Sequence, residues 1–282
     1  IAGIKRSCEI WAAHGFTTAT DNVPSMKMVE RYKKALDEGS LFIRMNYWPR
    51  VMKIEDTYQF PTTKPGTDVS NNRLMITQGQ FKHQIDGSPQ GYTAHFTQPY
   101  STQRPQDDGK YRGFPYVADR DAWIDYMVQV HKDGWQFTVH GNGDQGIQDV
   151  IDAVSEAQAV SPRQDHRHGI IHCQFVRPDQ LDQIKALGIS PSFFIGHTFY
   201  WGDRHKDIFF GPHRADHMSP LKGALDRGIR FTIHTDTFVT PIDGIQMVWS
   251  AVNRMSTGGQ IIGPDQRIEP LPALKAITIN AA

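Results

Sequence analysis

Four residues that could take part in metal-assisted chemistry lie in four separate apolar stretches of the chain. The stretches WQFTVH and RFTIHTD end in His140 and Asp236, RHGIIHC carries His172 just before its end, and GQFKHQID contains Lys82. Imidazole nitrogen and carboxylate oxygen are suitable ligands for zinc and similar divalent ions. A lysine amine becomes a ligand only after CO2 adds to it, and the resulting carbamate can bridge two metals. The residue types therefore predict a metal site.

The alternation of side chains along a strand indicates which residues could share that site. In RFTIHTD, Phe231 and Ile233 point to one face, whereas Thr232, His234 and Asp236 point to the other. An acid at the end of the polar face indicates that this face does not pack into a hydrophobic core. The pattern predicts that His234 and Asp236 face the same polar site.

The elements that must position these residues follow one another as apolar strands and amphipathic helices. The helix over 24–39 has Pro24 at its start and Gly39 at its end, as helices prefer, and Asp144 is expected to cap the helix that begins beside it. Strands are expected over 16–20, 41–48, 79–86, 135–140, 167–173, 189–195 and 230–236. Helices are expected over 4–15, 24–39, 119–134, 144–159, 178–188, 215–228, 242–255 and from 271 onwards. Irregular loops are expected over 50–78, from 87 to about 115, and over 196–215.

This order predicts a fold of the α/β class, with parallel strands joined by crossover helices. Regular pairing without a sign of a domain break favours a single (β/α)8 TIM barrel over residues 1–282. A barrel needs eight strands, and only seven are predicted, so the first strand is expected to precede Ile1. Catalytic residues of such barrels lie at the C-terminal ends of the strands, and Lys82, His140, His172 and Asp236 all fall near that end.

Composition excludes several classes of function. The 282 residues contain 30 Lys and Arg against 30 Asp and Glu, so the balanced charge suggests neither nucleic acid nor an anionic membrane surface as a partner. No apolar run approaches the roughly 20 residues of a membrane span. Two cysteines, Cys8 and Cys173, form neither a disulfide framework nor a zinc-finger spacing. A small-molecule substrate is the partner expected.

Each candidate also has a structural explanation. His140 could bind a loop carbonyl, Asp236 could cap the next turn, and Lys82 could be solvated or paired with an acid. The pair formed by His166 and His168 has metal-ligand spacing, but it begins its strand and is therefore expected to be structural. The active-site interpretation depends on agreement, because four separate strands bring suitable groups to one end.

At these positions the sequence resembles the amidohydrolase superfamily, in the branch called amidohydrolase family 3 and close to the N-substituted formamide deformylases. AAHGFTTATD, KHQIDGSPQGYTA, VHGNGDQGIQDVIDA and RHGIIHCQFVRPDQ resemble the motifs of its second, fourth, fifth and sixth strands. GHTFYWGDRH and GPHRADHMSP are similar to a subgroup with this segment after strand seven, and FTIHTDTFVTPID resembles the motif of strand eight. The resemblance covers nearly the whole chain and implies a metal-dependent hydrolase fold.

The resemblance also implies a role for each residue. Lys82 would be the carboxylated lysine that bridges two metals, and His140 and His172 would bind the second metal. Asp236 would bind the first metal and carry a proton from the metal-activated hydroxide to the departing nitrogen. His197 and Trp201 would line the substrate pocket, whereas Asp86 and His234 would contact the ligands from behind. Divalent metal is implied as cofactor, with zinc favoured and one or two ions bound.

Two features of the family are not found in the sequence. No His-x-His pair precedes Lys82, although this pair is the usual seat of the first metal. The small β-sandwich built from both chain ends is also missing, so the barrel is expected to be partial at both ends. A metal-dependent hydrolase that cleaves a C–N bond in an amide, N-formyl or cyclic amide group remains the predicted function.

Two alternatives remain open from the sequence alone. The first is a catalytically silent barrel that binds a ligand in its mouth, and the second is a lyase that uses Lys82 as a Schiff-base amine. We also expect the protein to be located in the cytoplasm and to form a homodimer.

Overall fold

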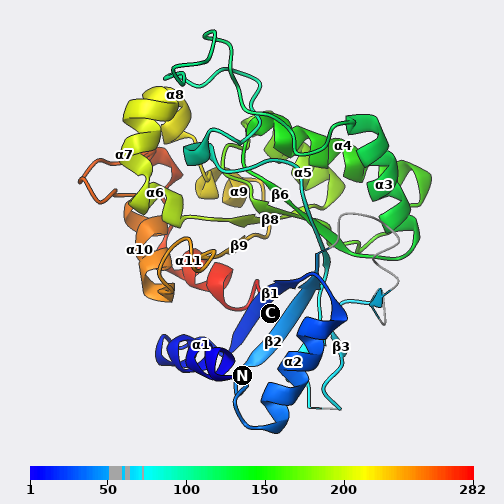
Figure 1. Cartoon of the computed structure of the whole chain (residues 1–282). Helices are drawn as coiled ribbons and strands as arrows, with labels where there is room; N and C mark the ends of the chain where they lie inside the picture. The colour runs from blue at the N-terminus through cyan, green and yellow to red at the C-terminus, as the bar shows by residue number, and fades with distance from the viewer. Residues whose placement is uncertain (51–58, 61–63, 72) are drawn as a thin grey trace. The chain divides into compact units, whose positions relative to one another are not determined.

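The computed structural model describes residues 1–50, 59–60, 64–71 and 73–282 (Figure 1). The chain forms two compact units. The first consists of Ile1–His83 with Tyr126–Thr138, and the second of Gln84–Asp125 with Val139–Ala282. The chain passes between the units at three points, which lie inside β5 (Phe81–Gln84), α3 (Arg120–Lys132) and β6 (Phe137–Gly141). The single domain expected over 1–282 stays a prediction.

The first unit contains a four-stranded sheet in the order β1-β2-β4-β3. Strands β1 (Thr18–Val23), β2 (Arg44–Pro49) and β4 (Ile76–Gln78) are parallel, and β3 (Thr67–Asp68) runs antiparallel to β4. The strands predicted over 16–20 and 41–48 are confirmed with shifted ends. The prediction that 50–78 is irregular is wrong for β3 and β4, and its residues 51–58, 61–63 and 72 lie outside the described part of the chain.

Two helices accompany this sheet, α1 (Ala2–Ala13) and α2 (Met26–Asp37), as predicted. In α2 the buried side chains are Val29, Tyr32 and Ala35. They recur every three residues, so they form one stripe along the helix, which is the pattern of a helix packed on one side only. The other side carries the lysines and glutamates of ERYKKALDE.

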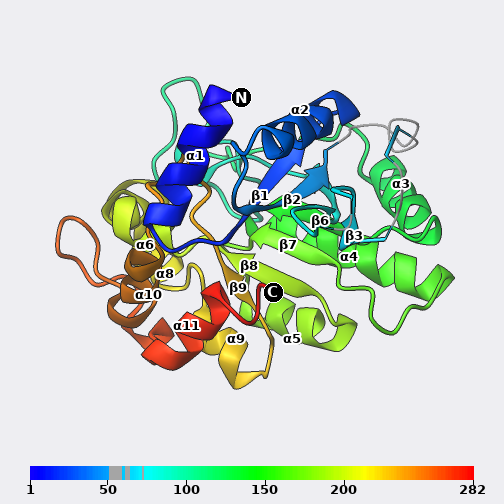
Figure 2. The ribbon, with the colours of Figure 1, turned by 90° about the horizontal axis from the view of Figure 1, so that it is seen from below.

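The second unit carries the strands that hold the histidines. The sheet runs from β6 through β7 (Gly169–His172) and β8 (Ser190–Phe193) to β9 (Thr232–Ile233). Strands β7, β8 and β9 are parallel and lie side by side in Figure 2, with His172 opposite Phe193 and Phe193 opposite Ile233. The predicted strand over 230–236 is therefore much shorter than expected, because regular pairing ends at Ile233.

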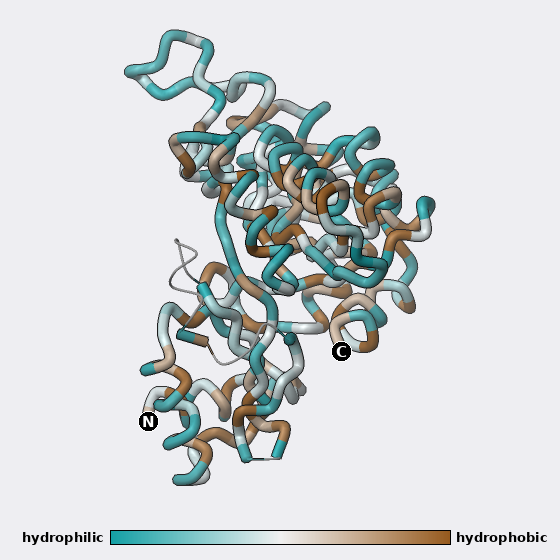
Figure 3. The backbone as a smooth tube through the Cα atoms, turned by 90° about the vertical axis from the view of Figure 1, so that its right-hand side faces the viewer, coloured by the Kyte–Doolittle hydropathy of each residue, from teal (hydrophilic) through white to brown (hydrophobic). Residues whose placement is uncertain are grey.

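Helices alternate with these strands in the second unit. The predicted ones are confirmed as α4 (Asp144–Val160), α5 (Pro178–Leu187), α9 (Leu221–Asp226), α10 (Gly244–Asn253) and α11 (Pro270–Ile277). Figure 3 shows hydrophilic and hydrophobic stretches alternating along the helices, which is expected when one side of each helix packs inward. The arrangement agrees with the predicted α/β class.

Two predictions about this unit are wrong. Residues 196–215 are not a loop but a run of short helical segments, namely α6 (Gly196–Tyr200), α7 (Gly202–Arg204), a π-helix (His205–Phe209) and α8 (Gly211–Asp216). Asp144 does not occupy the N-cap of α4, because Gly143 holds that position. The Asp144 carboxylate instead accepts from Thr97 and from Arg177, so it ties the preceding long loop and α5 to the start of α4.

Candidate active site

Asp86 is a buried carboxylate on which several hydrogen-bond donors converge. Its Oδ1 accepts the backbone N–H of Asn142 at 3.0 Å, and its Oδ2 accepts those of His95 at 3.0 Å and Gly143 at 2.8 Å. The Nδ1 atom of His140 lies 3.1 Å from Asp86 Oδ1. Because an ionised carboxylate only accepts, this contact places the proton of a neutral His140 on Nδ1 and leaves a lone pair on Nε2.

The side chain of Asn142 agrees with this tautomer. Its Nδ2 donates to the carbonyl oxygen of Gly87 at 3.0 Å and lies 3.3 Å from His140 Nε2. An amide N–H directed at Nε2 is favourable only when that nitrogen carries a lone pair. The residues around His140 therefore leave a lone pair on Nε2, which the role predicted for this histidine requires.

His172 lies beside His140, with ring centroids 4.4 Å apart and the rings nearly perpendicular. In the strand register His172 is opposite Phe193, whose side chain is buried. His172 has a φ of 73°, in the left-handed region that non-glycine residues rarely adopt. This conformation ends the regular alternation, and the His172 ring meets that of His234, whose Nε2 lies 3.0 Å from His172 Nδ1.

Aromatic side chains border this pair of histidines. The ring of Phe194 lies 5.8 Å from that of His172 and 4.2 Å from that of His197, and Trp201 lies 5.5 Å from His197. Burial lowers the pKa of His197 well below its ordinary value, so the imidazole is neutral at physiological pH. The two residues predicted to line the substrate pocket, His197 and Trp201, thus both lie next to the ring of Phe194, which borders His172.

A further buried histidine, His205, lies next to His197 with ring centroids 5.8 Å apart. Its Nδ1 contacts Gln174 Nε2 at 3.3 Å and the sulfur of Met218 at 3.3 Å. Burial lowers the pKa of His205 to about 3, because the charged form of the ring loses its contact with water. His205 was not singled out in the sequence.

The depressed pKa of His205 predicts acid sensitivity. An unfolded chain binds a proton at this residue near its ordinary value of 6.5, whereas the folded protein resists protonation down to about 3. Stability is therefore complete above pH 6.5 and falls by about 1.4 kcal/mol per pH unit below it. We expect His205→Gln to flatten the pH dependence of urea unfolding between pH 7.5 and 4.5, although His197 leaves a residual slope. The exposed His217→Gln is the control, and equal slopes in both variants would contradict the prediction.

Asp236 and Lys82 are the other two predicted ligands. Asp236 is exposed in the turn after β9, where its φ is 50° and its carbonyl oxygen accepts the N–H of Val239 at 2.7 Å. Lys82 is buried in the first unit, where it forms an isolated parallel bridge with Arg50. Their roles as ligands stay predictions.

The donor set can be tested for fit to a metal ion. Across residues 1–50, 59–60, 64–71 and 73–282, no group of three or more His, Cys, Asp or Glu side chains is arranged around one cation position. His140 and His172 nevertheless fit as two members of a ligand set, because their rings adjoin and the Nδ1 atom of each contacts another side chain. The structure therefore supports a two-histidine portion of a metal site.

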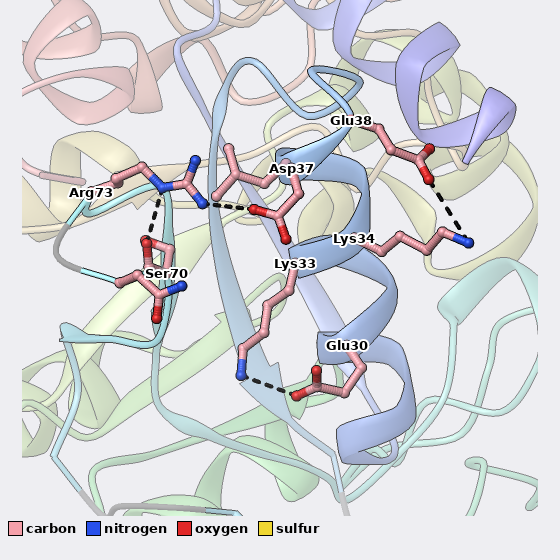
Figure 4. Close-up of a pocket in the computed structure, with 9 residues that line it drawn as sticks. Glu30, Lys33, Lys34, Asp37, Glu38, Ser70 and Arg73 are labelled. Atoms are coloured by element: carbon pink, nitrogen blue, oxygen red, sulfur yellow. Dashed lines mark hydrogen bonds and ion pairs between the residues drawn. The ribbon is translucent and has the colours of Figure 1, made fainter.

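Other candidates are structural. His166 accepts the N–H of His168 at 2.9 Å through Nδ1, and its Nε2 contacts the carbonyl of Leu187 at 2.7 Å, as expected of a structural histidine. A cleft of about 380 Å³ in the first unit is lined by charged residues of α2 and by Arg73. Figure 4 shows these charges paired with one another, as in the contact of Arg73 with Asp37, so each charged side chain labelled at the cleft already has a partner.

Four further residues complete the site and were not predicted from the sequence, namely Asn142, Ser192, Phe194 and His95. Ser192 Oγ lies 2.8 Å from His234 Nδ1. Strand alternation alone could have indicated it, because Ser192 is opposite Thr232 and His234 lies two residues further along the same face. The contribution of His95 could not be predicted, because it is made by the backbone of a loop.

The backbone of His95 lies so close to Gly143 that we expect position 143 to require glycine. A Cβ atom there would lie 2.0 Å from the carbonyl oxygen of His95 and 2.9 Å from its nitrogen. Both are backbone atoms with partners of their own: the nitrogen donates to Asp86, and the oxygen accepts the N–H groups of Gln145 and Gly146. We therefore expect Gly143→Ala to cost at least the 1–3 kcal/mol typical of overpacking. Urea unfolding measures the loss. Gly3→Ala, where nothing lies within 4 Å, is the control, and equal stability of the two variants would show that the loop yields.

Known proteins resemble this chain in sequence and in fold. It is 28% identical over 160 residues to an N-substituted formamide deformylase of Arthrobacter pascens, an alignment that covers 56% of this chain and 29% of that protein. An uncharacterised metal-dependent hydrolase from Pyrococcus horikoshii OT3 superposes with a TM-score of 0.82 at 20% identity, covering 99% of this chain and 53% of that one. The atrazine chlorohydrolase TrzN of Arthrobacter aurescens TC1, solved with zinc and atraton, gives a TM-score of 0.56 at 11% identity over 99% of this chain and 58% of that one. The predicted fold, that of a metal-dependent hydrolase barrel, is confirmed.

The chain spans only part of these proteins, between 29% and 40% of the length of the curated relatives it matches. No helix within the described residues is long and apolar enough to cross a membrane. The pattern of the amidohydrolase family matches residues 3–282, which is almost every residue of the sequence. The chain therefore belongs to the amidohydrolase family.

Proposed function

We propose that the protein is a metal-dependent hydrolase that cleaves a C–N bond other than a peptide bond, in an amide, N-formyl or cyclic amide substrate. The observation that carries the proposal is the pair of His140 and His172, whose rings lie 4.4 Å apart. Asp86 and His234 contact these rings on Nδ1, at 3.1 and 3.0 Å. Similarity to a formamide deformylase supports an N-formyl or N-acyl amine as the substrate.

Zinc is the metal we propose, as one or two ions, and a zinc-bound structural relative supports it. When bound, the ion would polarise the substrate carbonyl and lower the pKa of a water molecule. His140 and His172 would hold it through their Nε2 atoms, and Lys82 in carboxylated form would complete the ligand set. Asp236 is proposed as the ligand that accepts a proton and passes it to the departing nitrogen.

His197 and Trp201 are proposed to contact the substrate. Both border the ring of His172 through Phe194, and His197 is neutral because burial lowers its pKa. A neutral imidazole next to an indole suits an uncharged, partly apolar group better than an ionised one. The proposal includes a small-molecule substrate, neither nucleic acid nor membrane as a partner, a cytoplasmic location and a homodimer.

The test combines metal analysis with a substrate screen on the full-length protein. Elemental analysis is expected to find a divalent ion. N-formyl amines, N-acyl amines and cyclic amides are then assayed beside a peptide amide. Hydrolysis in the first three groups that is lost on chelation and restored by zinc would support the proposal. A protein that holds no divalent ion and cleaves none of these compounds would overturn it. Borohydride trapping of a carbonyl compound on Lys82 would instead support a lyase.

A further inference from the structure

We propose that His234 and Ser192 form a hydrogen-bonded relay that positions His172 as a metal ligand by holding its proton on Nδ1. The inference rests on the proposed function, because it concerns the same metal site. From the sequence His234 was expected to share a face with Asp236, and in the structure its ring contacts that of His172, which ends β7. His234 is thereby a positioning residue, which acts through His172.

The relay consists of two contacts in series. His172 Nδ1 lies 3.0 Å from His234 Nε2, and His234 Nδ1 lies 2.8 Å from Ser192 Oγ. Both distances are those of good hydrogen bonds. A neutral imidazole has one N–H and one lone pair, so the direction of one bond determines the direction of the other.

Only one of the two directions allows His172 to bind a metal through Nε2. In that direction His172 Nδ1–H donates to His234 Nε2, and His234 Nδ1–H donates to the Ser192 hydroxyl oxygen. In the opposite direction the proton of His172 would lie on Nε2 and would block the ligand atom. Ser192 can accept or donate, so it can terminate the relay in the binding direction.

The packing around the relay holds the rings in place. Phe194 lies 5.4 Å from the ring of His234 and 5.8 Å from that of His172. The backbone N–H of His234 donates to the carbonyl of Phe193 at 3.1 Å, which ties His234 to the strand that carries Ser192. The ring positions are thus set by strands β8 and β9 and by a neighbouring aromatic side chain.

His140 offers a parallel case within the same site. Its Nδ1 contacts Asp86, and its Nε2 keeps a lone pair. The two histidines would therefore present the same ring nitrogen to the ion, although one is held by a carboxylate and the other by an imidazole and a hydroxyl. A neutral relay adds no negative charge, so it tunes the basicity of His172 less strongly than Asp86 tunes that of His140.

The test compares two substitutions at position 234 in the full-length protein freed of metal. Gln can place its side-chain oxygen near the position of the His234 Nε2 acceptor, whereas Leu removes the acceptor. We expect His234→Leu to weaken zinc binding by 10–100-fold in a competition assay with a chelator, and His234→Gln to stay within about threefold of wild type. Ser192→Ala should give an intermediate loss. His213→Leu, at an exposed histidine, is the matched control.

A second measurement tests the relay in the metal-free protein, by locating the proton on each imidazole. Two-bond ¹H–¹⁵N spectra of the imidazoles report which ring nitrogen carries each proton. We expect His172 to hold its proton on Nδ1 in wild type and in His234→Gln, and to shift towards Nε2 in His234→Leu. Thermal unfolding confirms that each variant is folded.

The outcomes separate the relay from the proposed function. A folded His234→Leu variant that binds zinc as tightly as wild type, or a Gln variant as weak as the Leu variant, would overturn the relay. A wild-type protein that binds no zinc would overturn the proposed function. In that case the imidazole spectra still decide the relay, because an unchanged His172 tautomer in His234→Leu would refute it.

Discussion

Replacing His172 by alanine is expected to abolish hydrolysis and to weaken zinc binding by more than the 10–100-fold typical of losing an outer partner of a ligand. The substitution removes one of two adjacent imidazoles, whose centroids lie 4.4 Å apart, and leaves His140 as the single histidine of the pair. His172 also ends β7 in a left-handed conformation that alanine tolerates no better than histidine, so its removal relieves no strain. The loss of zinc binding and of hydrolysis should therefore be larger than the loss of folding stability.

The measurement is zinc content after dialysis, together with turnover of the best substrate in the screen. His213→Ala removes an exposed histidine and serves as the control. Full zinc content and activity in the His172 variant would show that the metal is bound elsewhere and that the pair is structural.

Replacing Asp86 by asparagine is expected to lower the free energy of unfolding by about 1–3 kcal/mol, the range found when a buried hydrogen-bond donor is left without an acceptor. The carboxylate accepts the N–H groups of His95, Asn142 and Gly143 and contacts His140 Nδ1. An asparagine NH2 group would meet some of these donors with another donor, and buried donors would be left unsatisfied. The same change releases the tautomer of His140, so zinc affinity should fall as well.

Urea unfolding gives the stability loss for the Asp86 variant. Asp108→Asn is the matched control, because that exposed carboxylate accepts only the local N–H of Lys110 among the contacts described for its side chain. A loss below 1 kcal/mol for Asp86→Asn would mean that the loop and the start of α4 do not depend on this carboxylate.

Part of the site could be predicted because it follows from strand ends alone. His140 lies next to the last residue of β6 and His172 is the last residue of β7, and these two strands are neighbours in one sheet. In the predicted parallel order, the C-terminal ends of such strands lie at one edge of the sheet. Asp236 was expected on the same face as His234 by alternation. That rule holds only while the strand continues, and β9 ends at Ile233, three residues before an exposed Asp236 with a φ of 50°.

The helical segments over 196–216 could not be predicted for a different reason. Glycines at 196, 202 and 211 interrupt the periodicity, and no segment is longer than six residues. Such short helices depend on tertiary packing, because nucleation is costly and few backbone bonds repay it. Strand β4 is similar, since its three residues acquire strand geometry by pairing with β2.

The division of the chain into two interleaved units limits how the gene can recombine. Each unit is assembled from two separate pieces of sequence, with crossings inside two strands and a helix. Recombination at a single breakpoint between Ile1–His83 and Tyr126–Thr138 would separate these two pieces, which together form the first unit. Neither unit can therefore be exchanged as one continuous segment of the gene. We expect the two units to be inherited together.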